Sequence, residues 1–223
     1  MSSARVTRLT FTGPVVVAIA ILSAVPALAG GSGWKVGSYT PSGQSLSMSS
    51  AAEGAGIAAF NFTDQPDTAL LATSRGSSKG ALLGDLTDKT VSATFTISGA
   101  TGAFTYWGEG TADNPCVNPA NTRLYFTTDN GGGFAYTHYW WSNPNSAYLA
   151  NDTFTVTASV VPAQWSDWNG KGGLEEPAGF ADAASNVTLI GLSFGGGCFF
   201  ENGVGTTDGS GTFTLDRFTV TGP

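Results

Sequence analysis

Apolar and polar residues alternate with a period of two along much of this chain, a pattern typical of half-buried β-strands. The clearest case is residues 90–98, where Val91, Ala93, Phe95 and Ile97 alternate with serine and threonine. Alternating or continuous apolar runs bounded by turn residues predict nine further strands, at residues 34–39, 57–62, 68–73, 104–107, 123–127, 134–141, 153–161, 187–194 and 213–220.

The stretch 187–220 organises this prediction. Residues 187–194 are apolar on both parities, which favours a central strand covered on both faces. Gly195–Gly197 follows and permits a sharp change of direction, because glycine has no Cβ to clash at positive φ. In the last strand the apolar residues are at odd positions up to Leu215 and at even positions from Phe218. This change predicts a β-bulge or a crossing between sheets near Asp216–Arg217.

Only residues 177–185 favour a helical turn, and Asp129–Gly133 has the composition of a hairpin turn. About ten short strands separated by turns predict an all-β fold. We expect a two-sheet antiparallel β-sandwich or jelly roll with one short helical turn.

The N-terminal residues have the pattern of a secretory signal peptide. Arg5 and Arg8 precede an apolar run at 15–22, and Ala27–Ala29 forms a small-x-small cleavage site. We therefore expect residues 1–29 to be removed and residues 30–223 to form a single secreted, extracellular domain without a membrane anchor.

The charge balance bears on possible partners. The 223 residues include 9 basic and 16 acidic side chains, a formal net charge of −7. Nucleic acids and anionic membranes select basic surfaces, so neither is expected as the main partner. The oligomeric state is left open.

Two cysteines, Cys116 and Cys198, are present. Export places the chain in an oxidising compartment, which favours a disulfide between them. The alternative is a pair of buried free thiols.

The segment 136–141 is unusually aromatic. As a strand it would place Tyr136, His138 and Trp140 on one face, and Thr137, Tyr139 and Trp141 on the other. We expect one face to enter the core and the other, Tyr136, His138 and Trp140, to stack on and hydrogen-bond a glycan. The alternative is that all these rings fill the core, and Trp165 and Trp168 have the same ambiguity.

The sequence offers little for catalysis. His138 is the single histidine, and no G-x-S-x-G motif occurs. The carboxylates available for glycoside hydrolysis lack the close strand spacing of jelly-roll glucanases: Glu109, Asp167, Glu175, Glu176 and Glu201. A binding role is therefore favoured over an enzymatic one.

Residues 150–220 contain Asn186-Val-Thr-Leu-Ile-Gly-Leu and Gly211-Thr-Phe-Thr-Leu-Asp-Arg-Phe-Thr-Val220. This part of the chain resembles the C-terminal third of galactose-binding-like jelly rolls, a superfamily with many carbohydrate-binding modules. The resemblance implies a structural calcium near Asp216, and no other cofactor is expected.

We expect a non-catalytic carbohydrate-binding module with a polysaccharide or other glycan as partner. The alternative is a structural or surface-interaction protein without a small ligand, and the third is a glycoside hydrolase.

Overall fold

The computed structural model describes residues 33–39, 46–52, 56–74, 82–129, 131 and 133–222. The expected signal peptide, residues 1–29, lies outside the described residues. The strands are β1 (Trp34–Tyr39), β2 (Leu46–Ser50), β3 (Ala58–Asn61), β4 (Thr68–Thr73), β5 (Thr90–Ser98), β6 (Phe104–Tyr106), β7 (Asn121–Thr127), β8 (Tyr139–Tyr148), β9 (Asp152–Ser159), β10 (Trp165–Asp167), β11 (Leu189–Gly195), β12 (Val204–Thr206) and β13 (Thr212–Thr221). The helical elements are α1 (Pro177–Ser185) and two 3₁₀ turns, η1 (Tyr136–His138) and η2 (Pro162–Gln164).

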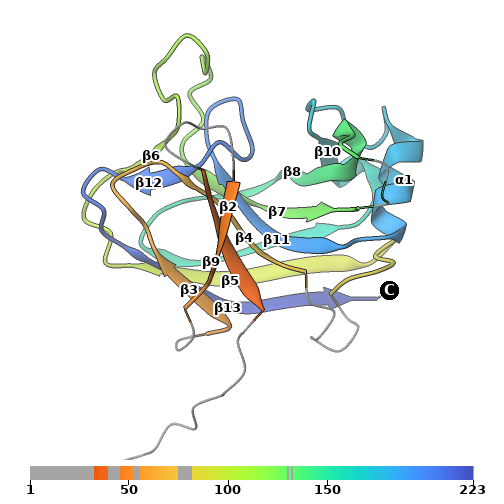
Figure 1. The fold of residues 1–223 in the computed structure, drawn as a ribbon, viewed down its shortest axis with the longest axis horizontal. Coiled ribbons are helices and arrows are strands. Elements are labelled where there is room, and N and C mark those ends of the chain that lie inside the picture. The colour runs from red at the N-terminus through yellow and green to blue at the C-terminus, as the bar shows by residue number, and fades with distance from the viewer. Residues whose placement is uncertain are drawn as a thin grey trace, which may run out of the picture. The chain divides into compact units, whose positions relative to one another are not determined.

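These strands form two antiparallel sheets in two layers (Figure 1). The large sheet has the order β10-β8-β7-β11-β4-β1-β2, and β12 and β6 extend it beside β4. The small sheet has the order β3-β13-β5-β9. The all-β sandwich predicted from the sequence is confirmed, with more strands than the ten expected.

The small sheet shows how the alternating pattern becomes structure. Val91, Ala93, Phe95 and Ile97 of β5 are buried in the core, as expected. The intervening hydroxyls face solvent and pair with those of β9, in the pairs Ser92–Thr157 (2.8 Å), Thr94–Thr155 (3.0 Å) and Thr96–Thr153 (2.9 Å). Such cross-strand pairs stabilise the sheet where it has no apolar cover.

The predicted parity change in the closing strand is also present. The register of β13 against β5 shifts between Leu215 and Arg217, leaving Asp216 unpaired in the ladder. This bulge lets Phe213, Leu215 and Phe218 all reach the core.

β11 lies in the middle of the large sheet, between β7 and β4. Its Ile190, Leu192 and Phe194 enter the core, and Leu189 packs on a second apolar cluster on the outer face of the same sheet. The expectation of a central strand covered on both faces is confirmed, and the outer cover is where the candidate site lies.

α1 closes one end of the sandwich (Figure 1). Its Phe180 contacts Trp140 at 5.1 Å and Phe126 at 6.2 Å between ring centroids. Trp165 packs against Phe126, with ring centroids 4.6 Å apart, and is almost fully buried, so it fills this end of the core.

Candidate functional site

The outer face of the large sheet carries aromatic side chains. The register places Gly191 of β11, Tyr125 of β7 and Trp141 of β8 side by side, because these residues alternate with those that enter the core. The Tyr125 and Trp141 rings lie 5.2 Å apart, and Trp141 is only 2% exposed. A sheet face normally left to solvent is therefore apolar and covered by loops.

The loops leave a cavity of about 860 Å³ over this face. Trp141 lines it together with five other parts of the chain: Tyr39, residues 65–67, Trp107, residues 168–170 and residues 198–202. The rings of Trp107, Trp168 and Phe199 are 53%, 47% and 45% exposed, which places them at the rim.

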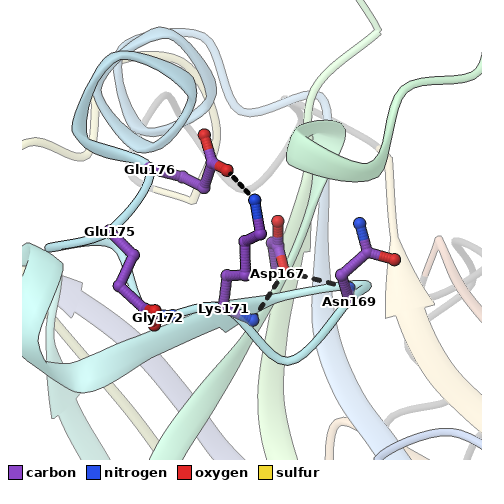
Figure 2. Close-up of polar contacts among 6 residues, drawn as sticks. All are labelled: Asp167, Asn169, Lys171, Gly172, Glu175 and Glu176. Carbon is purple, nitrogen blue, oxygen red and sulfur yellow. Dashed lines mark hydrogen bonds and ion pairs between the residues drawn. The ribbon is translucent and has the colours of Figure 1, made fainter.

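One wall is the loop between β10 and α1, shown in Figure 2. The carboxylate of Asp167, buried at the end of β10, accepts hydrogen bonds from the backbone N–H groups of Asn169 and Lys171, both at 2.9 Å. This turn fixes the loop. Trp168 is thereby held 5.8 Å from Trp141, measured between ring centroids.

Charged side chains make further contacts within this loop and with the start of α1. Lys171 pairs with Glu176 at the start of α1, and Glu175 accepts a hydrogen bond from the Gly172 N–H at 2.8 Å (Figure 2). The ion pair is solvent-exposed, so the pKa of Lys171 is raised by Glu176 without a large gain in stability.

The opposite wall is the loop between β11 and β12, which carries the disulfide. Cys116 and Cys198 are bonded, with their Cα atoms 5.0 Å apart, so the predicted disulfide is confirmed. Cys198 itself lines the cavity, next to Phe199.

Two buried asparagines hold this wall to the β6–β7 loop. Asn114 accepts a hydrogen bond from the Cys198 N–H at 2.7 Å and donates to the Gly196 carbonyl at 3.3 Å. Asn202 donates to the Trp107 carbonyl at 2.7 Å and accepts from the Gly196 N–H at 2.8 Å. The two rim rings, Trp107 and Phe199, are thus placed by the same network.

Gly197 belongs to this network. Its φ is +64°, and a Cβ there would lie 2.1 Å from Oδ1 of Asn114. Only glycine combines this backbone conformation with so close an approach.

The polar centre of the cavity is Glu201. The Tyr39 hydroxyl donates to the Glu201 backbone carbonyl at 2.9 Å and to its Oε1 at 3.5 Å. The residue is partly exposed, yet its Oε2 is buried without a hydrogen-bond partner. Burial raises the pKa of Glu201 to about 8, against the opposing effect of the nearby Tyr39 hydroxyl and Trp141 indole.

Glu201 in turn affects the tyrosines around it. Burial, followed by the charge of Glu201, raises the pKa values of Tyr39 and Tyr125 above their usual range. Both phenols therefore stay protonated at physiological pH and act as neutral hydrogen-bond donors.

Trp141 has an unusual indole. Two other buried tryptophans pair their indole N–H groups with backbone carbonyls: Trp140 with Thr137 at 2.7 Å and Trp165 with Ser159 at 2.8 Å. The indole N–H of Trp141 is buried but makes no hydrogen bond of good geometry. It interacts instead with the Glu201 carboxyl, whose pKa it lowers, so the indole and the carboxyl form a polar pair at the cavity.

The residues expected to bind glycan are placed differently from the prediction. Trp140 is 0% exposed and lies in the core, so the expectation that it stacks on a sugar is wrong. Tyr136 is exposed and His138 partly exposed, but both lie in η1 and not on a strand. The residues of this segment that face outward from the core are Tyr139 and Trp141.

The ambiguity of the two loop tryptophans is resolved by burial. Trp165 lies in the core, whereas Trp168 is exposed beside the cavity. Phe134 and Tyr139 extend the aromatic cluster from Trp168, with ring centroids at 5.8 and 5.6 Å from it.

Of the carboxylates considered for glycoside hydrolysis, Glu201 alone lines the cavity, while Asp67, not considered earlier, lines it too. Asp216 accepts a hydrogen bond from Thr96 at 2.8 Å on the exposed face of the small sheet. Within the described ranges, no group of three or more His, Cys, Asp or Glu side chains is placed to hold a metal ion.

Sequence reasoning named Glu201 only among the carboxylates available for hydrolysis. It missed most of the other lining residues: Tyr39, Asp67, Trp107, Phe199 and Phe200. One signal was available. Phe199-Phe200-Glu201 directly follows a cysteine expected to form a disulfide, so these residues belong to an anchored loop.

No model of a known protein family, no curated protein and no solved structure matches this chain. In the part of the chain that the structure describes, no helix is long and apolar enough to cross a membrane. The function is therefore argued from the cavity itself.

Proposed function

We propose that the cavity on the outer face of the large sheet binds glycans, and that the protein is a non-catalytic carbohydrate-binding module. The observation that carries the proposal is the open cavity of about 860 Å³ with exposed Trp107, Trp168 and Phe199 at its rim. A space of this size accommodates a short oligosaccharide.

The chemistry of the lining fits a sugar. Pyranose rings present apolar C–H faces, which stack on exposed indole and phenyl rings. Gln65 and Asn169 are exposed at the same cavity and offer amide donors and acceptors for hydroxyls.

The proposal also covers secretion of the protein and its superfamily. The N-terminal pattern of residues 1–29 and the Cys116–Cys198 disulfide both fit a secreted protein. Membership of the galactose-binding-like superfamily is part of the proposal, supported by the resemblance over residues 150–220 and by the two-sheet sandwich.

The test is binding to a panel of soluble oligosaccharides, measured by calorimetry with the mature protein. A shallow open site should bind in the micromolar to millimolar range, because little surface is buried. Trp168→Ala should weaken binding at least about tenfold, since the rim ring is lost. The matched control is Tyr148→Ala, which removes a ring of similar exposure (58%) that does not line the cavity.

If both variants bind as the unmodified protein does, the cavity is not the binding site. If no oligosaccharide binds, the glycan proposal fails and a surface-interaction protein without a small ligand replaces it. Release of reducing ends during the measurement would overturn the non-catalytic part and favour hydrolysis.

A further inference from the structure

The cavity is lined by acidic groups without a basic counterpart in the described ranges. Asp67 and Glu201 line it, and no lysine, arginine or histidine among the described residues does so. A neutral glycan can use these carboxyl groups only as hydrogen-bond acceptors, whereas a cationic glycan also gains charge pairing and an anionic glycan is disfavoured.

Glu201 also lacks a counter-ion. Its hydrogen-bonding neighbours, the Tyr39 hydroxyl and the Trp141 indole, are neutral, and it forms no ion pair with any residue in the described ranges. Arg123 does not line the cavity: its guanidinium lies 4.5 Å from the Phe200 ring centroid and donates to the Ser142 carbonyl at 2.9 Å. A buried carboxyl without a paired cation is unfavourable when charged, so a cationic ligand would stabilise it.

The surrounding rings favour a cation as well. Trp141 and Phe200 lie 6.2 Å apart between ring centroids, and both line the cavity with Glu201. Aromatic faces attract ammonium groups, most strongly where water is excluded. Carboxylate and aromatic walls together are the chemistry that recognises an amine on an apolar frame.

We propose that the preferred ligand of this cavity is a glycan bearing protonated amino groups, such as a glucosamine oligomer. This inference rests on the proposed glycan-binding function and names its ligand class. The ammonium group pairs with Glu201 and Asp67, and the apolar sugar faces stack on the rim rings Trp168, Trp107 and Phe199.

The binding step has a protonation signature. In the free protein, burial raises the pKa of Glu201 to about 8, so its carboxyl is mostly protonated at pH 6. A bound ammonium favours the carboxylate, and the carboxyl proton is released to the buffer. The titratable groups packed on this carboxyl, Tyr39 from β1 and Tyr125 from β7, have raised pKa values and do not exchange protons in this range.

The experiment compares a glucosamine tetramer with an N-acetylglucosamine tetramer by calorimetry at pH 6, in two buffers of different ionisation enthalpy. We expect the amine form to bind at least about tenfold more tightly, which corresponds to about 1.4 kcal/mol. The heat should depend on the buffer, showing proton release.

Glu201→Gln should abolish the preference for the amine form over the N-acetylated form, and Asp67→Asn should reduce this preference. Asp152→Asn, an equal charge change on the small sheet, controls for the general attraction of an acidic protein to a cationic sugar. If Glu201→Gln does not fold, Asp67→Asn and the buffer dependence of the unmodified protein still decide the matter.

Equal or tighter binding of the N-acetylated tetramer overturns this inference and leaves the glycan-binding proposal intact. An amine preference that both cavity variants retain, or that Asp152→Asn loses equally, also overturns it, because the attraction is then diffuse. Binding of neither tetramer, nor of any oligosaccharide in the panel, overturns both proposals.

Discussion

Tyr39 and Glu201 are 162 residues apart in the chain, and the Tyr39 hydroxyl donates a hydrogen bond of 2.9 Å to the Glu201 backbone carbonyl. The contact joins β1 near one edge of the large sheet to the disulfide-bearing loop after β11. It also places a phenol beside a carboxyl that is buried and without a counter-ion. The cavity therefore contains a titratable group whose charge is unfavourable in the folded state.

The first prediction concerns pH. Burial raises the pKa of Glu201 from 4.5 to about 8, so in this interval the folded state holds a proton that the unfolded state has lost. The contribution of Glu201 to the free energy of unfolding should therefore fall as the pH rises from about 5 to 8, by about 2–4 kcal/mol. Urea unfolding at several pH values measures it.

Glu201→Gln removes this titration, so its free energy of unfolding should exceed that of the unmodified protein at pH 8 and change less with pH. Glu109→Gln, at an exposed loop position, should leave the pH dependence unchanged. Parallel pH profiles for all three proteins would show that Glu201 titrates normally.

The second prediction separates core from rim among the tryptophans. Trp140 is fully buried against Phe180, so Trp140→Ala should lower the free energy of unfolding by about 3–5 kcal/mol. Trp168→Ala should cost about 1 kcal/mol or less, because the ring is half exposed. Denaturant unfolding of the two variants measures both free energies. Equal losses of unfolding free energy would mean that Trp168 is a core residue.

The sequence predicted strand positions well where the pattern is local. β5 and the bulge of β13 depend on alternation within single strands, and both are confirmed. The inward face of residues 136–141 was assigned wrongly because Trp140 and Trp141 are both aromatic and both buried. Alternation identifies the core face only when the other face is polar, and here the outer face has its own apolar cover.

The cavity was harder still to predict, for a topological reason. Its lining comes from segments that are up to about 160 residues apart, such as Tyr39 and Phe199, and no local pattern brings them together. The disulfide was the one long-range contact that the sequence predicted, because the chain has two cysteines and each can pair only with the other.

The third prediction concerns that link. Cys116 and Cys198 are 82 residues apart, so replacing both by serine frees a long loop in the unfolded chain and should lower stability by about 2–4 kcal/mol. Denatured but unreduced protein should show no thiol that reacts with an alkylating reagent. Two reactive thiols would contradict the bond, and an unchanged stability of the double variant would contradict its contribution.

The fourth prediction tests the asparagine network behind the rim. Gly197→Ala forces a Cβ onto Asn114, whereas Gly110→Ala has a similar positive φ (+72°) and open space around it. Backbone strain of about 1–2 kcal/mol is common to both variants. Gly197→Ala should cost about 1–3 kcal/mol more, because buried hydrogen bonds of Asn114 are lost. Equal costs in thermal unfolding would show that the Asn114 contacts contribute nothing.

The fifth prediction concerns the loop that holds Trp168. The Asp167 carboxylate is buried and accepts two backbone N–H groups, so Asp167→Ala leaves those donors unpaired and should cost about 1–3 kcal/mol. Asp167→Asn keeps an acceptor oxygen and should recover part of the loss. Lys171→Met removes only an exposed ion pair with Glu176 and should change stability by less than about 0.5 kcal/mol. Hydrogen exchange of the Asn169 and Lys171 amides provides a local readout: exchange should accelerate in Asp167→Ala and stay slow in Lys171→Met. Acceleration in Lys171→Met alone would mean that the ion pair, and not the buried carboxylate, fixes this wall of the cavity.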